Sequence, residues 1–150
     1  MPFDRLIQTL DQWAEANPGI EVLAQVGQDS SYRPSHVEWV PTMTPQEFRS
    51  AVQRASLIVG HAGMGTILTA LEFGKPLVVL PRQGALRETR NDHQIATARR
   101  FQDRPGVHAA MKENELPLLL DRHTELAPPE KIASVASNSL LDTIRNFIHN

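Results

Sequence analysis

Short apolar runs alternate with longer amphipathic segments along most of this chain. The apolar runs predict strands, because the strands of a parallel sheet are covered on both faces. The segments between them carry apolar residues at three- and four-residue spacing, which is typical of helices that pack on a sheet. We predict strands over residues 20–26, 36–40, 57–59, 77–80 and 107–111. This alternation predicts an α/β protein with a doubly wound, Rossmann-like parallel sheet.

Helices are predicted on either side of these strands. The first, Phe3 to Asn17, is amphipathic and is stopped by Pro18-Gly19. The second opens with Thr44-Pro45-Gln46-Glu47, which combines a capping box with proline at the first helical position. Further helices are expected from about 64 to 73 and over residues 91–102, 113–121 and 129–149.

A glycine-rich turn follows the strand at residues 57–59. Three glycines occupy positions 60–65, so backbone N–H groups there can approach a ligand without an intervening side chain. The helix that begins near Met64 points its unsatisfied N–H groups and its positive dipole end at the carboxyl edge of the sheet. The turn therefore predicts a phosphate or diphosphate site. The alternative is a glycine turn that serves only close packing of helix on sheet.

Composition narrows the classes of function. The chain has 15 basic and 17 acidic residues, a net charge of −2, which argues against a nucleic-acid-binding protein driven by overall charge. It has no cysteine for disulfides or thiolate metal sites, and its scattered histidines predict no metal site. No apolar run approaches the roughly 20 residues that span a bilayer, and no signal segment opens the chain. We expect a soluble protein whose membrane contact is peripheral or through a partner.

Three motifs in order carry a resemblance to a known family. They are His61-Ala62-Gly63-Met64-Gly65-Thr66, then residues 71–77 (LEFGKPL), then Asn91-Asp92-His93-Gln94. Together they resemble the C-terminal, sugar-nucleotide-binding domain of glycosyltransferase family 28, over roughly residues 2–120. Within the family the chain is similar to the small catalytic subunits of bacterial capsule and exopolysaccharide synthesis, and to that of the dolichol-linked N-acetylglucosaminyltransferase.

The resemblance implies that residues 1–150 form one sugar-nucleotide-binding domain, the C-terminal half of a GT-B glycosyltransferase. It also implies an inverting, metal-independent hexosyltransferase that uses a UDP-sugar and no cofactor. Such enzymes carry the acceptor site and general base in a second domain, for which 150 residues leave no room. A membrane-associated partner subunit with a lipid-linked saccharide acceptor is therefore implied, with this chain held at the cytoplasmic face of the membrane. A non-catalytic sugar-nucleotide-binding module is the alternative.

His61 is the candidate catalytic residue, because it ends the central strand at the carboxyl edge, where ligands of such sheets bind. Its imidazole is expected to donate to a phosphate or to the sugar. The alternatives are that it caps a neighbouring carbonyl, and that it serves as the base in place of a partner residue.

The other candidate site residues fall into two groups. Backbone N–H groups and one hydroxyl are expected to stabilise the departing diphosphate, and two side chains of the following helix are candidates for the ribose: Gly63, Met64, Gly65, Thr66, Thr69 and Glu72. Many relatives carry glutamate where this chain has Thr69. Carboxamides and carboxylates suit sugar hydroxyls, so the expected sugar-binding residues are Asn91, Asp92, His93 and Gln94. Asn91 and Gln94 also have the spacing of a capping box.

Arginines gather in a short span after the strand at residues 77–80, at Arg82, Arg87, Arg90, Arg99, Arg100 and Arg104. The patch is expected to hold the donor diphosphate, an anionic sugar, the pyrophosphate of a lipid-linked acceptor or the membrane surface. For the last three arginines a solvated helix face is the default interpretation.

A central strand precedes the first helix in the resembled family, and here Met1-Pro2 stands in its place. Loss of such a strand leaves N–H and C=O groups unpaired on its two neighbours. We therefore expect lowered stability and activity, or replacement of the strand by another chain.

Overall fold

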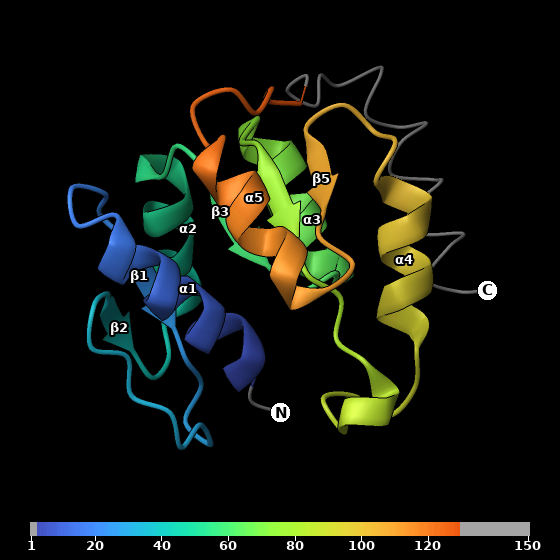
Figure 1. Cartoon of the computed structure of the whole chain (residues 1–150). Coiled ribbons are helices and arrows are strands. Elements are labelled where there is room, and N and C mark those ends of the chain that lie inside the picture. Colours follow the sequence, from blue (N-terminus) through green and yellow to red (C-terminus); the bar gives the residue numbers. More distant parts are fainter. Residues whose placement is uncertain (1–2, 130–150) are drawn as a thin grey trace.

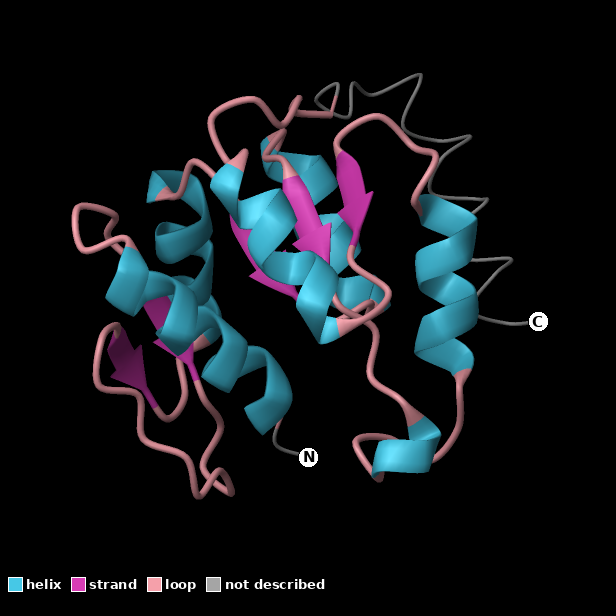
Figure 2. Ribbon diagram, in the orientation of Figure 1, coloured by secondary structure: helices cyan, strands magenta, loops and turns pink. Residues whose placement is uncertain are grey.

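The computed structural model describes residues 3–129, and its strands alternate with helices as predicted (Figures 1 and 2). All strand pairs are parallel, and the arrowheads in Figure 2 point toward the same end. Each predicted strand is present but shorter than expected. The strands are β1 (Leu23–Gln25), β2 (Glu38–Val40), β3 (Ile58–Gly60), β4 (Leu77–Val79) and β5 (Val107–Ala109).

The helices also lie where the sequence predicts them. They are α1 (Asp4–Ala16), α2 (Pro45–Arg54), α3 (Met64–Phe73), α4 (His93–Phe101) and α5 (Leu116–Asp121), with 3-10 turns η1 (Gly84–Leu86) and η2 (Glu113–Glu115). The segment predicted as one helix over residues 113–121 is divided into η2 and α5. Pro117 is tolerated because it lies in the first turn of α5, where N–H groups have no intrahelical acceptor. The final helix predicted over residues 129–149 falls almost wholly outside the described residues.

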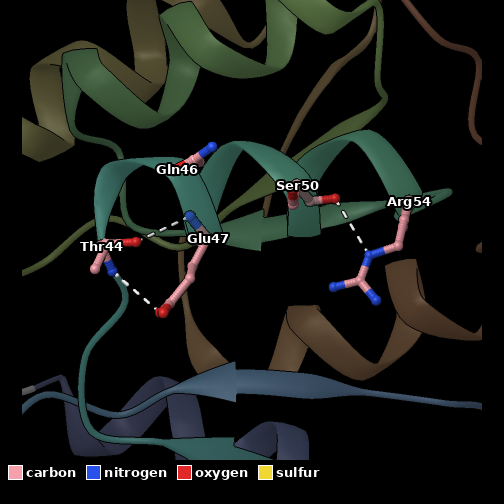
Figure 3. Close-up of a pocket in the computed structure, with 5 residues that line it drawn as sticks. All are labelled: Thr44, Gln46, Glu47, Ser50 and Arg54. Atoms are coloured by element: carbon pink, nitrogen blue, oxygen red, sulfur yellow. Dashed lines mark hydrogen bonds between the residues drawn. The ribbon is translucent and has the colours of Figure 1, made fainter.

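Local signals explain how two helices begin and end. At the start of α2 the predicted capping box is present (Figure 3): Glu47 N–H donates to Thr44 Oγ1 at 3.1 Å, and Thr44 N–H donates to Glu47 Oε2 at 3.2 Å. At the end of α3, Gly74 adopts the left-handed conformation with φ of 65°, which suits glycine at a helix C-terminus. Both boundaries were predicted from the sequence.

Helices cover both faces of β4, whose three residues are fully buried. On one face Val78 packs in a cluster with apolar residues of α1 and α5, including Leu6, Leu10 and Leu116. On the other face Leu77 and Val79 pack with α3 and α4 in a second cluster, which includes Ile67, Ala98 and Phe101. The doubly wound arrangement is therefore confirmed.

The strands form two hydrogen-bonded groups within the described chain, β1-β2 and β3-β4-β5. Helix α1 packs against both groups, since Ile7 contacts Ala24 of β1 while Leu10 belongs to the cluster of Val78. The described residues thus leave β1 and β3 each with a strand on one side only. The loss of a central strand between them, and its replacement by another chain, stay predictions.

The prediction that residues 57–59 form a strand buried on both faces is wrong. Leu57, Ile58 and Val59 are only partly buried, because β3 is an edge strand within the described sheet. An apolar run indicates a strand but cannot show how many neighbours the strand has.

Candidate functional site

The candidate site lies at the carboxyl edge of β3 and β4. The glycine-rich turn follows β3, and a long connection that includes η1 joins β4 to α4. Figure 1 shows this connection running beyond the sheet at the end where α1 begins. The first turn of α1 is therefore close to the loops that the sequence analysis singled out.

The N-terminus of α3 has free hydrogen-bond donors. Gly63 is its N-cap residue and makes no side-chain cap, in contrast to the capping box of α2. Within the described chain, no group accepts from the N–H groups of Met64, Gly65 or Thr66. A Cβ placed on Gly65 would meet nothing within 4 Å. An uncapped helix N-terminus with open space before it is suited to bind an anion.

The His61 ring lies directly over Gly63. A Cβ added to Gly63 would come within 2.1 Å of His61 Cε1 and 2.7 Å of Nδ1, so only glycine leaves room for this ring. Nδ1 is buried and has no hydrogen-bond partner. The alternative in which His61 caps a neighbouring carbonyl is therefore not seen at Nδ1.

His61 is neutral near pH 7. Burial lowers the pKa of its imidazole, the charge of Arg82 lowers this pKa further, and the Gln94 side chain opposes both effects. A neutral ring has one nitrogen that donates and one that accepts. Such a ring can orient a bound group without carrying charge.

The lowered pKa of His61 predicts a pH-dependent contribution to stability. Because the folded protein binds this proton less readily than the unfolded chain, in which histidine has its ordinary pKa of 6.5, the contribution is present above pH 6.5. It is lost as the pH falls from 6.5 through the lowered pKa of the folded state. We expect His61→Gln to weaken the dependence of the unfolding free energy on pH between 8 and 5, measured by urea titration. Equal dependence in the two proteins would contradict this.

Gln94 and Arg82 join His61 in one cluster. Arg82 N–H donates to Gln94 Oε1 at 3.0 Å, which ties the end of β4 to the first turn of α4. The guanidinium of Arg82 lies over the Phe3 ring, with Cζ 5.2 Å from the ring centroid. The sequence analysis placed Arg82 only in a diffuse patch. The available signal was its position two residues after a buried strand.

Arg5 holds the connection after β4 in place. Its guanidinium donates to Glu88 Oε1 at 2.8 Å and Oε2 at 2.9 Å, and to the Pro81 carbonyl at 3.0 Å. Glu113 accepts a further bond at 3.0 Å, and Gln83 N–H donates to Glu88 at 3.0 Å. The hydrogen bond to Glu88 raises the pKa of Arg5. The sequence analysis missed this network, because its members are far apart in the chain.

The other predicted sugar-binding residues shape the same connection. Asp92 Oδ1 accepts from Gly84 N–H at 2.9 Å, and Asn91 Oδ1 accepts from His93 N–H at 2.8 Å. The predicted capping box of Asn91 and Gln94 is wrong, since α4 begins at His93 and the Gln94 side chain binds Arg82 N–H instead. Tertiary contact with β4 has replaced the local bond.

The two predicted ribose-binding residues have other partners. Thr69 Oγ1 donates to the Gly65 carbonyl at 2.8 Å, within its own helix. Glu72 forms an exposed ion pair of 3.2 Å with Arg49 of α2. These contacts do not bring Thr69 or Glu72 into the cluster of His61, Arg82 and Gln94, and their role toward a ribose stays a proposal.

A surface cavity on α2 is a poorer anion site. Figure 3 shows its lining residues, Thr44, Gln46, Glu47, Ser50 and Arg54. The capping box already uses Thr44 and Glu47, and Arg54 donates to the Ser50 carbonyl at 3.3 Å. The helix N-terminus that borders this cavity is thus satisfied by its own side chains.

Two kinds of functional feature, a metal-binding cluster and a membrane-spanning helix, are absent from residues 3–129. This range contains no cluster of three or more His, Cys, Asp or Glu residues placed to hold a metal ion. No helix within it has the length and apolar character needed to cross a bilayer.

The chain is similar to a family of known proteins and to one curated human protein. The glycosyltransferase family 28 C-terminal domain matches residues 3–149. A 50-residue segment is 41% identical to the human UDP-N-acetylglucosamine transferase subunit ALG13, covering 33% of this chain and 4% of that protein.

Three solved structures share the fold. The glycotransferase of kitacinnamycin is 22% identical, with a TM-score of 0.59 over 95% of this chain and 34% of its own. MurG of Acinetobacter baumannii is 19% identical, with a TM-score of 0.51 over 93% of this chain and 46% of its own. The glycosyltransferase VinC, in complex with dTDP, is 19% identical, with a TM-score of 0.51 over 92% of this chain and 33% of its own. The chain thus spans less than half of each of these proteins.

Proposed function

Because the chain belongs to glycosyltransferase family 28, as a C-terminal domain of that family, we propose that it is the donor-binding catalytic subunit of a UDP-sugar-dependent glycosyltransferase. It transfers a hexose to a lipid-linked acceptor in polysaccharide biosynthesis. The observation that carries this proposal is the uncapped N-terminus of α3 beside the neutral His61 ring. UDP binds at this edge, with its diphosphate on the free N–H groups.

Departure of the nucleotide creates negative charge on the diphosphate. The N–H groups of Met64, Gly65 and Thr66 are held by the helix before the reaction begins, so they stabilise this charge without reorganisation. Because these donors take the place of a cation at the diphosphate, the transfer needs no metal ion. Inversion at the sugar is what the family resemblance implies.

The side chains around the turn orient the donor. His61 binds a phosphate or the sugar through its free ring nitrogen, while Gln94 and Asp92, with Asn91 and His93, contact the hexose. Thr69 and Glu72 serve the ribose. His61 is neutral near pH 7, but the general base for the acceptor comes from the partner.

The partner is a membrane-associated subunit that binds the lipid-linked saccharide. One observation supports it: the human relative is named as a transferase subunit. In this arrangement the chain is peripheral to the inner face of the cytoplasmic membrane.

The test is transfer of radiolabelled sugar from UDP-hexoses to a membrane lipid fraction, with and without the companion subunit. We expect transfer only when both polypeptides are present. Full activity of this chain alone would refute the divided site. UDP binding without transfer in the reconstituted complex would favour a non-catalytic sugar-nucleotide-binding module.

A further inference from the structure

Arg82 carries a charge that the described protein does not pair. Arg82 forms no salt bridge with any described carboxylate, and its Nε is buried without a hydrogen-bond partner. Its Nη1 reaches only the Glu88 carbonyl, at 3.5 Å, the outer limit of a hydrogen bond. Leaving a buried donor unsatisfied is costly, so such a group in a folded protein needs an explanation.

The nearby carboxylate of Glu88 does not remove this charge. Both of its oxygens accept from Arg5, at 2.8 and 2.9 Å, and Oε1 also accepts from Gln83 N–H. Glu88 is therefore occupied by a different guanidinium. Arg82 has in its place the face of the Phe3 ring, which accommodates a cation but accepts no N–H bond in the plane of the guanidinium.

The position of Arg82 is set by several contacts. Its backbone N–H donates to Gln94 Oε1, and the carbonyl of the preceding Pro81 accepts from Arg5. The ring of Phe3 lies under its guanidinium. A guanidinium held in this way loses little conformational freedom when it binds a ligand. Its planar fork matches two oxygens of one phosphoryl or carboxylate group.

Arg82 also borders the donor site. Its charge acts on His61, whose ring covers Gly63 at the N-terminus of α3. His61 follows β3 and Arg82 follows β4, so the two residues lie at the same carboxyl edge of the sheet, where the Gln94 side chain is a partner of both.

We propose that Arg82 is a donor-binding residue whose guanidinium takes an oxyanion of the sugar nucleotide next to His61. This inference rests on the proposed function and adds to it. The oxyanion is a phosphoryl group of the diphosphate or the carboxylate of an acidic hexose. Both present the same pair of oxygens, and the experiment separates them.

The experiment measures binding of UMP, UDP, UDP-glucose and UDP-glucuronate to the full 150-residue chain by calorimetry. Arg82→Met and Arg82→Lys are compared with Arg54→Met, which removes an exposed arginine of α2 that has no place in the donor site. Loss of a bidentate, charge-assisted contact is expected to weaken binding by about 10- to 100-fold. Lysine restores part of this loss because it keeps the charge but not the fork.

The four nucleotides identify the oxyanion. If Arg82→Met lowers the affinity for UDP and leaves the affinity for UMP almost unchanged, the guanidinium binds the phosphoryl group farther from the nucleoside. If only the affinity for UDP-glucuronate falls, the guanidinium binds the sugar carboxylate. If Arg82→Met binds all four nucleotides as Arg54→Met does, the proposal is overturned while the proposed function stands. If the unaltered chain binds none of them, the proposed function fails first.

Thermal unfolding without nucleotide separates a binding role from a structural one. The buried Nε of Arg82 has no hydrogen-bond partner, so Arg82→Met should unfold at the same temperature as the unaltered chain or at a higher one. This result is typical of a residue that serves function at some cost in stability. Unfolding at a markedly lower temperature would show a structural role and overturn the proposal.

Discussion

Gly63→Ala is expected to lower sugar transfer by about 100-fold or more, because displacement of a reacting group by about 1 Å has effects of this size. The added Cβ would lie 2.1 Å from His61 Cε1, so the imidazole must leave its place over the turn. The same movement separates His61 from the Gln94 side chain. The measurement is kcat/KM for the UDP-sugar in the reconstituted complex, with UDP affinity measured in parallel.

Gly19→Ala is the matched control for this substitution. A Cβ on Gly19 would meet nothing within 4 Å. The Gly19→Ala protein should therefore fold and transfer sugar as the unaltered protein does. Gly65→Ala is informative for another reason: the helix should gain up to about 1 kcal/mol, while the methyl group obstructs the N–H donors. If Gly63→Ala retains the activity of Gly19→Ala, the placement of His61 over the turn has no role in transfer.

Glu88→Gln is expected to lower the free energy of unfolding by about 2–4 kcal/mol, since removing one partner of a buried ion pair leaves the other charge uncompensated. The side chains of Arg5 and Glu88 are only 13% and 10% exposed, and Arg5 keeps Glu113 and the Pro81 carbonyl as acceptors. The measurement is urea unfolding followed by circular dichroism, with unchanged m-values as the check on two-state behaviour.

Glu125→Gln provides the comparison for an exposed ion pair. Glu125 binds Arg122 at 3.1 Å, with both side chains about two-thirds exposed (64% and 66%), and such pairs contribute at most about 1 kcal/mol. If the two substitutions destabilise the protein equally, the Arg5–Glu88 network does not hold the connection after β4. Donor affinity of Glu88→Gln should also fall, because Arg82 depends on this connection for its position.

Elements with local signals were predicted well. The apolar runs located all five described strands, and the capping box located the first turn of α2. Gly74 located the end of α3. Each signal depends on residues within one or two turns of the chain, so it is readable without knowledge of the rest.

Elements that depend on neighbours were predicted less well. The run at residues 57–59 indicated a strand, but its burial was overestimated because β3 lies at an edge of the described sheet. Asn91 and Gln94 have capping-box spacing, yet Arg82 N–H competes for the Gln94 oxygen and takes it. A spacing rule cannot foresee a competitor that comes from another strand.

The amino-acid sequence by itself determined the order of strands and helices and the place of the glycine-rich turn, through side-chain periodicity and the absence of Cβ atoms at that turn. Only the tertiary structure decided which polar groups surround it. Arg5 and Glu88 are 83 positions apart, and they meet because α1 begins at the edge where β4 ends. His61, Gln94 and Arg82 meet for the same reason, since parallel strands bring their carboxyl ends to one edge.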